Sequence, residues 1–349
     1  MASFDPLRTR MQTINMAQVF GFAILSLTIT GILLVPFIDL LYKIKLQKRH
    51  NHHRDVFNQR VRLLDRLSVW KVGTPFGGGL LIILVVTFLS LWAYGLLRVD
   101  VKFWELFVLL FTFIGFGFLG FYDDLRKIFN THTGVFGLKL AHKFAIQCIL
   151  GLIIGAVMYF QLGYSFVYVH WFGNIVLGAL YIVFAAFVIV SFANAVNLSD
   201  GLDGLATGLL VICLLAFLAV SGSIIDPFLS LFIAILIGSV LAFLYFNIYR
   251  ARLWLGDVGA LSLGAVLGAV GLLTGKPLPV ALIGGVFVLE VGSTLLQILS
   301  RRFLGKRILP ATPIHVYFIK RGWEEPKVVM RAWLLGIVFA LLGLYIAFL

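Results

Sequence analysis

Ten long apolar stretches divide this chain, and short polar gaps separate them. A helix needs about 20 apolar residues to cross the roughly 30 Å hydrocarbon core of a bilayer. The composition agrees, because 61% of the residues are hydrophobic and only 12% are charged, whereas a soluble domain is about a quarter charged. We therefore predict an all-α, polytopic integral membrane protein that forms one domain over residues 1–349. The ten expected spans are Ala17–Leu41, Gly78–Leu97, Phe103–Phe121, Phe144–Leu162, Ile175–Val196, Leu205–Val220, Phe228–Phe246, Ala260–Leu273, Val280–Leu299 and Ala332–Leu349.

Lys and Arg residues fall almost entirely in alternate gaps between these stretches. The gaps 42–77, 122–143, 247–259 and 300–331 hold 9, 4, 2 and 8 of them, so 23 of the 28 share one side. The positive-inside rule makes that side cytoplasmic and puts both termini outside. The net charge of +13 is therefore largely topological, and it attracts anionic headgroups and phosphorylated substrates to the cytoplasmic face. We expect no nucleic-acid partner, because no recognition module accompanies the basic residues.

Carboxylates gather at the predicted cytoplasmic ends of the spans. Asp123 and Asp124 end the third span, and Asp257 follows the seventh. Adjacent aspartates repel each other, especially near a low-dielectric membrane. Arg126 and Lys127 could offset this charge, but a divalent cation suits the site better, because Mg²⁺ takes one or two carboxylates together with substrate phosphates. The alternative for each aspartate is a helix cap or a turn.

The segment between the fifth and sixth spans has a polar residue at every third position: Asn194, Asn197, Asp200 and Asp203. On a continuing helix these side chains would share roughly one face. A glycine follows each aspartate, which instead favours a broken helix whose backbone closely approaches a ligand. In both arrangements ionisable groups converge where a bilayer would exclude them, which is a functional hypothesis by default.

Three further segments hold candidate residues. Lys71 begins a Gly-rich turn over residues 71–79, whose backbone N–H groups could cradle a phosphate; the alternative is a flexible loop that enters a helix. Glu290, inside the ninth span, either lines a cavity or is a neutral, hydrogen-bonded side chain between helices. His315 lies between prolines and an aromatic pair, and a structural role is its alternative.

Together these segments resemble the polyprenyl-phosphate N-acetylhexosamine-1-phosphate transferase superfamily, and within it the muramoyl-pentapeptide branch. The strongest match is residues 194–206, where NAVNLSDGLDGLA differs from the family pattern only at Ser199. The pair Asp123-Asp124 with Lys127 matches the family's D-D-x-x-K. Lys71 with Thr74 matches its K-x-G-T-P start. Further matches are Lys143 and Gln147, then Glu290, Ser293 and Gln297, and finally the late motif Arg321–Glu325 with Val328, Val329 and Arg331.

Three motifs depart from the family patterns. Residues 256–260 read G-D-V-G-A where the family has G-D-T-G-S. Residues 247–251 read N-I-Y-R-A where it has N-x-x-P-A. His315 is followed by Val316 and Tyr317, whereas the family has three consecutive histidines at the loop that faces the substrate.

The resemblance implies a phosphoryl transfer in the inner membrane of a bacterial cell, with the active site on the cytoplasmic face. Undecaprenyl phosphate would accept phospho-N-acetylmuramoyl-pentapeptide from its UDP derivative, which gives UMP and the first lipid-linked precursor of peptidoglycan. The implied cofactor is Mg²⁺, or alternatively Mn²⁺. Nucleoside-type inhibitors and a homodimer are also expected from the resemblance.

The resemblance also assigns residues to roles. Catalysis falls to Asp123, Asp124, Asp257 and His315, and the three aspartates are also expected at the metal. Substrate binding is assigned to Lys71, Thr74, Lys127, Lys143, Asn194, Asn197, Asp200, Asp203, Asn247 and Gln297.

Two alternative functions stay open at this point. A relative that transfers N-acetylglucosamine phosphate would share the same membrane and metal chemistry. A secondary transporter would use buried Asp and Glu as a proton or ion relay. The polar motifs argue against transport, because they collect on one face and no inverted repeat is evident.

Overall fold

The computed structural model describes residues 15–47, 71–97, 103–129, 138–224 and 226–349. Parts of the basic gaps 42–77 and 122–143 lie outside these ranges. The helices are α1 (Met16–Lys43), α3 (Gly78–Leu97), α4 (Phe103–Phe129), α5 (Leu140–Phe160), α6 (Leu180–Ser199), α7 (Leu205–Ser223), α8 (Pro227–Asn247), α9 (Gly256–Leu273), α10 (Pro277–Ile283), α11 (Gly285–Phe303), α12 (Ile314–Lys320) and α13 (Glu325–Phe348). The strands β1 (Phe166–Val169) and β2 (Gly173–Val176) form an antiparallel hairpin.

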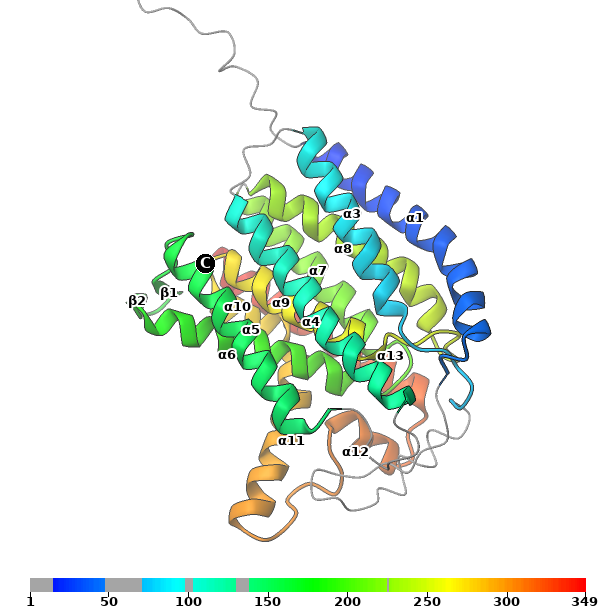
Figure 1. Cartoon of the computed structure of the whole chain (residues 1–349). Helices are drawn as coiled ribbons and strands as arrows, with labels where there is room; N and C mark the ends of the chain where they lie inside the picture. The colour runs from blue at the N-terminus through cyan, green and yellow to red at the C-terminus, as the bar shows by residue number, and fades with distance from the viewer. Residues whose placement is uncertain (1–14, 48–70, 98–102, 130–137, 225) are drawn as a thin grey trace, which may run out of the picture.

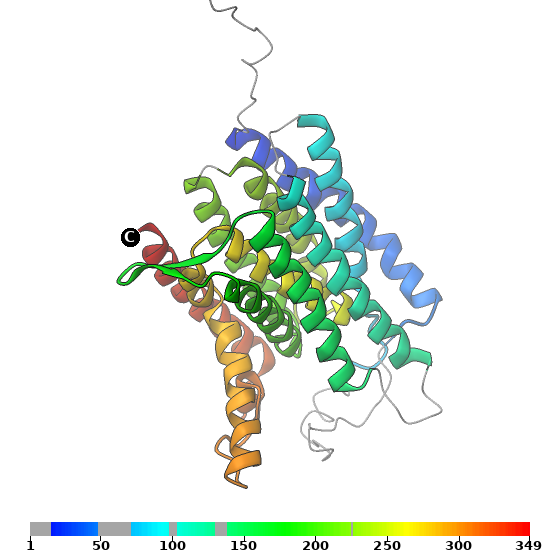
Figure 2. The same ribbon diagram turned by 60° about the vertical axis from the view of Figure 1, so that its left-hand side comes forward.

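The described residues confirm the prediction of a polytopic helical membrane protein. Nine of their helices are long and apolar enough to cross a bilayer, and the pair α10–α11, bent by 81°, makes a tenth if it counts as one span. The predicted span 280–299 corresponds to this bent pair. Figures 1 and 2 show the spans as one bundle, from whose lower end α11 and α12 project.

The helix α9 lies at the centre of the bundle, and α3, α4, α6, α7 and α10 pack around it. Its sequence is rich in Gly and Ala, which lets neighbouring backbones approach closely, as is common between membrane helices. A Cβ atom at Gly264 would lie 2.5 Å from the carbonyl oxygen of Phe192 on α6. The small residues of α9 lower its hydropathy, and they also allow it to serve as the central packing element of the bundle.

Several element boundaries differ from the sequence prediction; α5 and α9, for example, each begin four residues before the predicted span. The expected span 175–196 begins later, at Leu180, because residues 166–176 form the hairpin. Its second strand begins at Gly173, which has a φ of +71°. The helix α4 continues beyond the predicted end at Phe121, so Asp123 and Asp124 are helical residues. The helix α13 begins at Glu325, about two turns before the predicted span.

Candidate active site

A close contact between α4 and α9 brings the predicted carboxylates together. A Cβ atom at Gly120 on α4 would lie 2.2 Å from the carbonyl oxygen of Asp257, so only glycine allows this approach. One turn later on α4, Asp123 and Asp124 lie beside the first turn of α9. The Val258 N–H donates to Oδ2 of Asp124 over 3.1 Å, which fixes that carboxylate against the start of α9.

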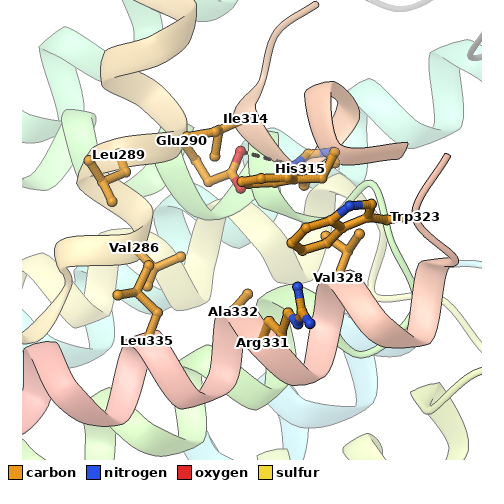
Figure 3. Close-up of a pocket in the computed structure, with 11 residues that line it drawn as sticks. Val286, Leu289, Glu290, Ile314, His315, Trp323, Val328, Arg331, Ala332 and Leu335 are labelled. Atoms are coloured by element: carbon orange, nitrogen blue, oxygen red, sulfur yellow. Dashed lines mark hydrogen bonds and ion pairs between the residues drawn. The ribbon is translucent and has the colours of Figure 1, made fainter. Parts of the chain in front are cut away.

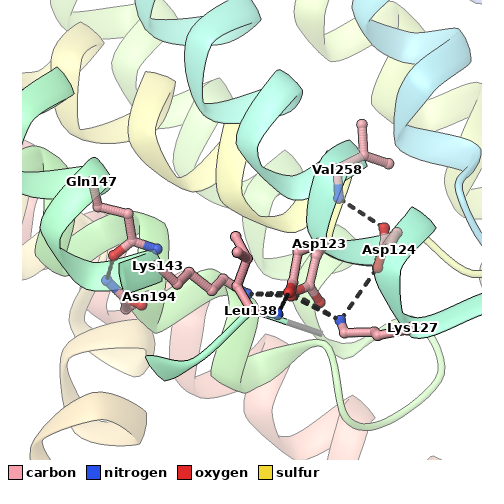
Figure 4. Close-up of polar contacts among 9 residues, drawn as sticks. Asp123, Asp124, Lys127, Leu138, Lys143, Gln147, Asn194 and Val258 are labelled. Carbon is pink, nitrogen blue, oxygen red and sulfur yellow. Dashed lines mark hydrogen bonds and ion pairs between the residues drawn. The ribbon is translucent and has the colours of Figure 1, made fainter. Parts of the chain in front are cut away.

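Two lysines join these three carboxylates, and Figure 4 labels both lysines together with Asp123 and Asp124. Lys127 Nζ lies 2.9 Å from Oδ2 of Asp257, 3.2 Å from Oδ2 of Asp123 and 3.3 Å from Oδ1 of Asp124. Lys143, from α5, contacts Asp257 and lies 3.1 Å from Oδ2 of Asp123. We call Asp123, Asp124, Asp257, Lys127 and Lys143 the carboxylate–lysine cluster. The cluster carries a formal charge of −1, because two ammonium groups only partly offset three carboxylates.

The carboxylate oxygens of the cluster suit a divalent cation that also binds oxygen atoms of the substrate. Within the described part of the chain, no three His, Cys, Asp or Glu side chains are arranged to hold a metal by themselves. Carboxylate oxygens are nevertheless the ligands that Mg²⁺ prefers, and Mg²⁺ is usually bound by one or two carboxylates with substrate phosphates and water. Asp257 has the most exposed of the three carboxylates, with 18% of its side chain accessible.

A second polar group lies next to the cluster on α5 and α6. Asn194 donates from Nδ2 to Oε1 of Gln147 over 2.7 Å and to the carbonyl of Val190 over 2.8 Å. Gln147 is buried, and its Nε2 has no hydrogen-bond partner among the described residues. A buried amide with an unused donor points to a missing acceptor, such as a phosphate or hydroxyl oxygen. Asn197, one turn further along α6, is partly exposed.

The break between α6 and α7 confirms the broken-helix alternative. The chain leaves the helix after Ser199 and re-enters at Leu205, and Gly204 has a φ of +77°, which favours glycine. The loop therefore holds Asp200 and Asp203 outside both helices, where they do not continue one helical face.

A buried ion-pair group holds this loop in place. Lys71 is 2% exposed, and its Nζ lies 2.8 Å from Oε1 of Glu325, 3.4 Å from Oδ1 of Asp203 and 3.1 Å from the carbonyl of Gly201. The same Glu325 oxygen accepts from the Asp203 N–H over 2.8 Å. Lys71 also lies over the Trp254 ring, 4.6 Å from its centroid. Its ammonium group therefore ties three distant segments together.

Burial raises the pKa of Asp203 above its usual value of 3.8. The positive charge of Lys71 and the hydrogen bond that the Ala251 N–H donates to Oδ2 over 2.8 Å act in the opposite direction, and the nearby Glu325 adds to the rise. Asp203 is thus a buried carboxylate whose charge depends on Lys71.

Other predicted substrate residues support the loops around the site. Asn247 is buried and accepts at Oδ1 from the Gly204 N–H and the Thr207 hydroxyl, while its Nδ2 donates to the Leu253 carbonyl. Gln297 accepts from the Leu309 N–H over 2.9 Å and so anchors the loop before α12.

Thr74 lies in the turn that follows Lys71, where its backbone N–H donates to the Lys71 carbonyl over 3.3 Å. Its side chain is partly exposed. The structure thus connects Thr74 to the ion-pair group around Lys71 rather than to the carboxylate–lysine cluster.

His315 and Glu290 form a buried pair between α12 and α11 (Figure 3). Nδ1 of His315 lies 2.9 Å from Oε2 of Glu290. The opposite ring nitrogen faces the α6–α7 loop, since a Cβ atom at Gly201 would lie 2.8 Å from Nε2. The pair therefore connects α11 to the α6–α7 loop, which holds Asp200 and Asp203.

Sequence reasoning missed Glu325 as a site residue. The sequence signal was weak, because Glu325 stands beside Glu324 and before Pro326, a pattern typical of an ordinary helix start. The partners of Lys143 could not be predicted either, because they come from two helices that are distant in sequence.

Comparisons with known proteins agree with this geometry. Residues 106–275, which include the carboxylate–lysine cluster, match the sequence model of the family described as glycosyl transferase family 4. A phospho-N-acetylmuramoyl-pentapeptide-transferase of Pelagibacter ubique is 41% identical over 299 residues, which cover 79% of this chain and 80% of that protein. The chain belongs to the phospho-N-acetylmuramoyl-pentapeptide-transferase family. A member from Rickettsia akari is also 41% identical, over 78% of this chain and 80% of its own length. Family membership confirms the resemblance inferred from the motifs and argues against a transporter.

Proposed function

We propose that this transferase moves phospho-N-acetylmuramoyl-pentapeptide from its UDP derivative to undecaprenyl phosphate. The net reaction forms a P–O bond between the lipid phosphate and the sugar-bearing phosphorus, and it breaks the diphosphate bond to release UMP. The observation that carries the proposal is the carboxylate–lysine cluster, which α4, α5 and α9 assemble at one end of a membrane bundle. Relatives named for this activity are 41% identical to the chain.

Each part of the cluster suits one requirement of phosphoryl transfer. The reaction needs the phosphates neutralised and the attacking and leaving oxygens held in line. Lys127 and Lys143 can bind phosphate oxygens once these compete with the carboxylates. Asp123 Oδ2, which now lies next to both ammonium groups, can accept the last proton of the lipid phosphate. The unused Nε2 of Gln147 can donate to a substrate oxygen nearby.

We propose Mg²⁺ as the cofactor, held by Asp257 together with Asp123 or Asp124. When bound, it would supply positive charge to the diphosphate and stabilise the transition state. We also propose that the cluster faces the cytoplasm of a bacterial inner membrane, because the basic gaps flank this end of the bundle. The buried partners of Asn247 and Gln297 indicate that these two residues position the site's loops rather than contact the substrate.

The experiment measures UMP and lipid-linked product from the purified protein with both substrates. Lys143→Met should reduce turnover by about 100-fold or more, because it removes a cation from the reacting group. Lys139→Met is the matched control, since Lys139 is exposed four residues earlier and should leave turnover unchanged. Excess chelator should also abolish turnover. Full activity of Lys143→Met, or full activity in chelator, would contradict the proposal for the cluster or for the metal, respectively.

A further inference from the structure

An apolar pocket of about 210 Å³ lies between α11, α12 and α13 (Figure 3). Its walls are aliphatic and aromatic, with Leu289 from α11, Phe318 from α12 and Leu335 from α13 among them. Two of its polar lining residues, Glu290 and His315, already bind each other. The pocket therefore offers an apolar space and few free hydrogen-bonding groups.

One cation lines this pocket, and two more lie over aromatic rings of the same segment, residues 317–331. Arg331, which lines it, lies 4.3 Å from the centroid of the Trp323 ring, and Lys327 lies 5.5 Å from the same ring. Trp323 itself stacks on Phe318 at 4.7 Å between centroids. Arg321, which follows the last residue of α12, lies with its guanidinium carbon 5.2 Å from the centroid of the Tyr317 ring on that helix. Three positive charges are thus positioned by rings rather than by carboxylates.

These cations are not neutralised by acidic neighbours within the described residues. Glu325, at the start of α13, is bound by Lys71. The exposed Glu324 forms no ion pair with the three cations. An anion outside the protein can therefore bind them.

The location suits the interface between headgroups and acyl chains. α13 is long and apolar enough to span a bilayer from Glu325, and Arg331 lies in its second turn. Trp, Arg and Lys at the end of a span are typical of the headgroup level, where long basic side chains extend towards water. The apolar pocket then extends towards the hydrocarbon.

We propose that this pocket binds an anionic phospholipid of the surrounding bilayer. One acyl chain would lie between α11 and α13, and the phosphate would contact Arg331 and Lys327. The polyprenyl phosphate substrate fits this location less well. Its phosphate has to reach Asp123 on α4, whose helix packs on α3, α5 and α9, whereas α11–α13 pack on one another and on α6, α7 and α10. This proposal does not depend on the identity of the transferred sugar.

The test uses brominated lipids, which quench nearby tryptophan fluorescence. The full-length protein is placed in phosphatidylcholine vesicles that contain a small, equal fraction of brominated phosphatidylglycerol or brominated phosphatidylcholine. The signal of Trp323 is the difference between the wild type and Trp323→Phe. We expect stronger quenching by the anionic lipid. Arg331→Gln with Lys327→Gln should reduce its relative affinity about 30-fold, which corresponds to about 1 kcal/mol for each cation.

Two control variants separate the pocket from general surface charge. Arg302→Gln, at the exposed end of α11, should leave the lipid preference unchanged. Ala332→Phe, which fills the pocket without removing a cation, should weaken quenching by either lipid. Thermal unfolding checks that each variant folds.

Three results would overturn the proposal. The first is equal quenching of Trp323 by the two brominated lipids. The second is a preference that survives the loss of both cations, or quenching by the two lipids that Ala332→Phe leaves unchanged. The third is displacement of the anionic lipid by an equal amount of undecaprenyl phosphate, which would identify the substrate as the occupant.

Discussion

Replacing Lys71 by methionine should destabilise the protein severely, because it leaves two buried carboxylates without their cation. The side chains of Lys71, Asp203 and Glu325 are 2%, 0% and 6% exposed. Removing one partner of such a buried group costs about 3–5 kcal/mol, since the remaining charge has neither water nor a counter-ion. Methionine keeps most of the apolar stem that packs near Trp254. The loss should therefore be electrostatic.

The assay is thermal unfolding of purified variants in detergent, with a double-mutant cycle. Lys71→Met should lower the Tm by several degrees. Adding Glu325→Gln should recover part of the loss, because it removes one stranded charge while Gln can still accept from the Asp203 N–H. We expect a coupling free energy of about 1–3 kcal/mol between the two positions.

Lys320→Met is the control for the loss of a lysine. Lys320 is exposed and donates only to the Pro310 carbonyl, so its replacement should change stability by less than about 0.5 kcal/mol. A Lys71→Met variant that is as stable as this control and still loses activity would contradict a purely structural role for Lys71. Lys71 would then act directly on the substrate, as the sequence motif predicted.

Three further predictions test the packing, the electrostatics and the topology. Gly120→Ala should force α4 away from the α9 backbone, which should lower the free energy of unfolding by about 1–3 kcal/mol and remove most of the turnover. Gly115→Ala should be tolerated, because its Cβ atom would meet only a side chain, at 3.4 Å. Equal Tm and activity in both variants would argue against the close contact. Folding raises the pKa of Asp203 above its usual value of 3.8, so the folded wild type binds this proton more tightly than the unfolded chain does. The wild type therefore loses stability as the pH rises above 3.8 and the folded-state pKa is passed, whereas Asp203→Asn has no such proton to lose. The Tm of Asp203→Asn minus that of the wild type should therefore increase as the pH rises above about 4, and a decrease would contradict the burial effect. Lys306 and Phe172 are both exposed and can be replaced by cysteine. The cysteine at position 306 should be labelled only from inside the cell, and the cysteine at position 172 only from outside. Labelling of both from the same side would overturn the topology.

Much of the fold follows from simple properties of the sequence. Apolar length predicts the spans, and glycines after Asp200 and Asp203 predict the broken helix between α6 and α7. The hairpin was missed because its residues 166–174 lie in the gap between two predicted spans, and its apolar residues 175 and 176 were assigned to the following span. The bend between α10 and α11 was also missed, since it interrupts a stretch that is apolar on both sides.

The site was predictable in its residue types but not in its pairings. Repulsion between Asp123 and Asp124 correctly indicated a need for nearby cations, and Lys127 is within reach along the same helix. Lys143 joins them only because α5 packs on α4, and Glu325 meets Lys71 across 254 positions. Such pairings depend on how the helices pack, which local spacing does not encode.

The most direct test of the central claim compares two donors with the same purified enzyme. Undecaprenyl phosphate is supplied as acceptor, UDP-N-acetylmuramoyl-pentapeptide or UDP-N-acetylglucosamine as donor, and UMP release gives kcat/KM for each. The account predicts a much larger kcat/KM for the muramoyl-pentapeptide donor and loss of that activity in Asp257→Ala. A larger value for UDP-N-acetylglucosamine, or full activity of Asp257→Ala, would contradict it.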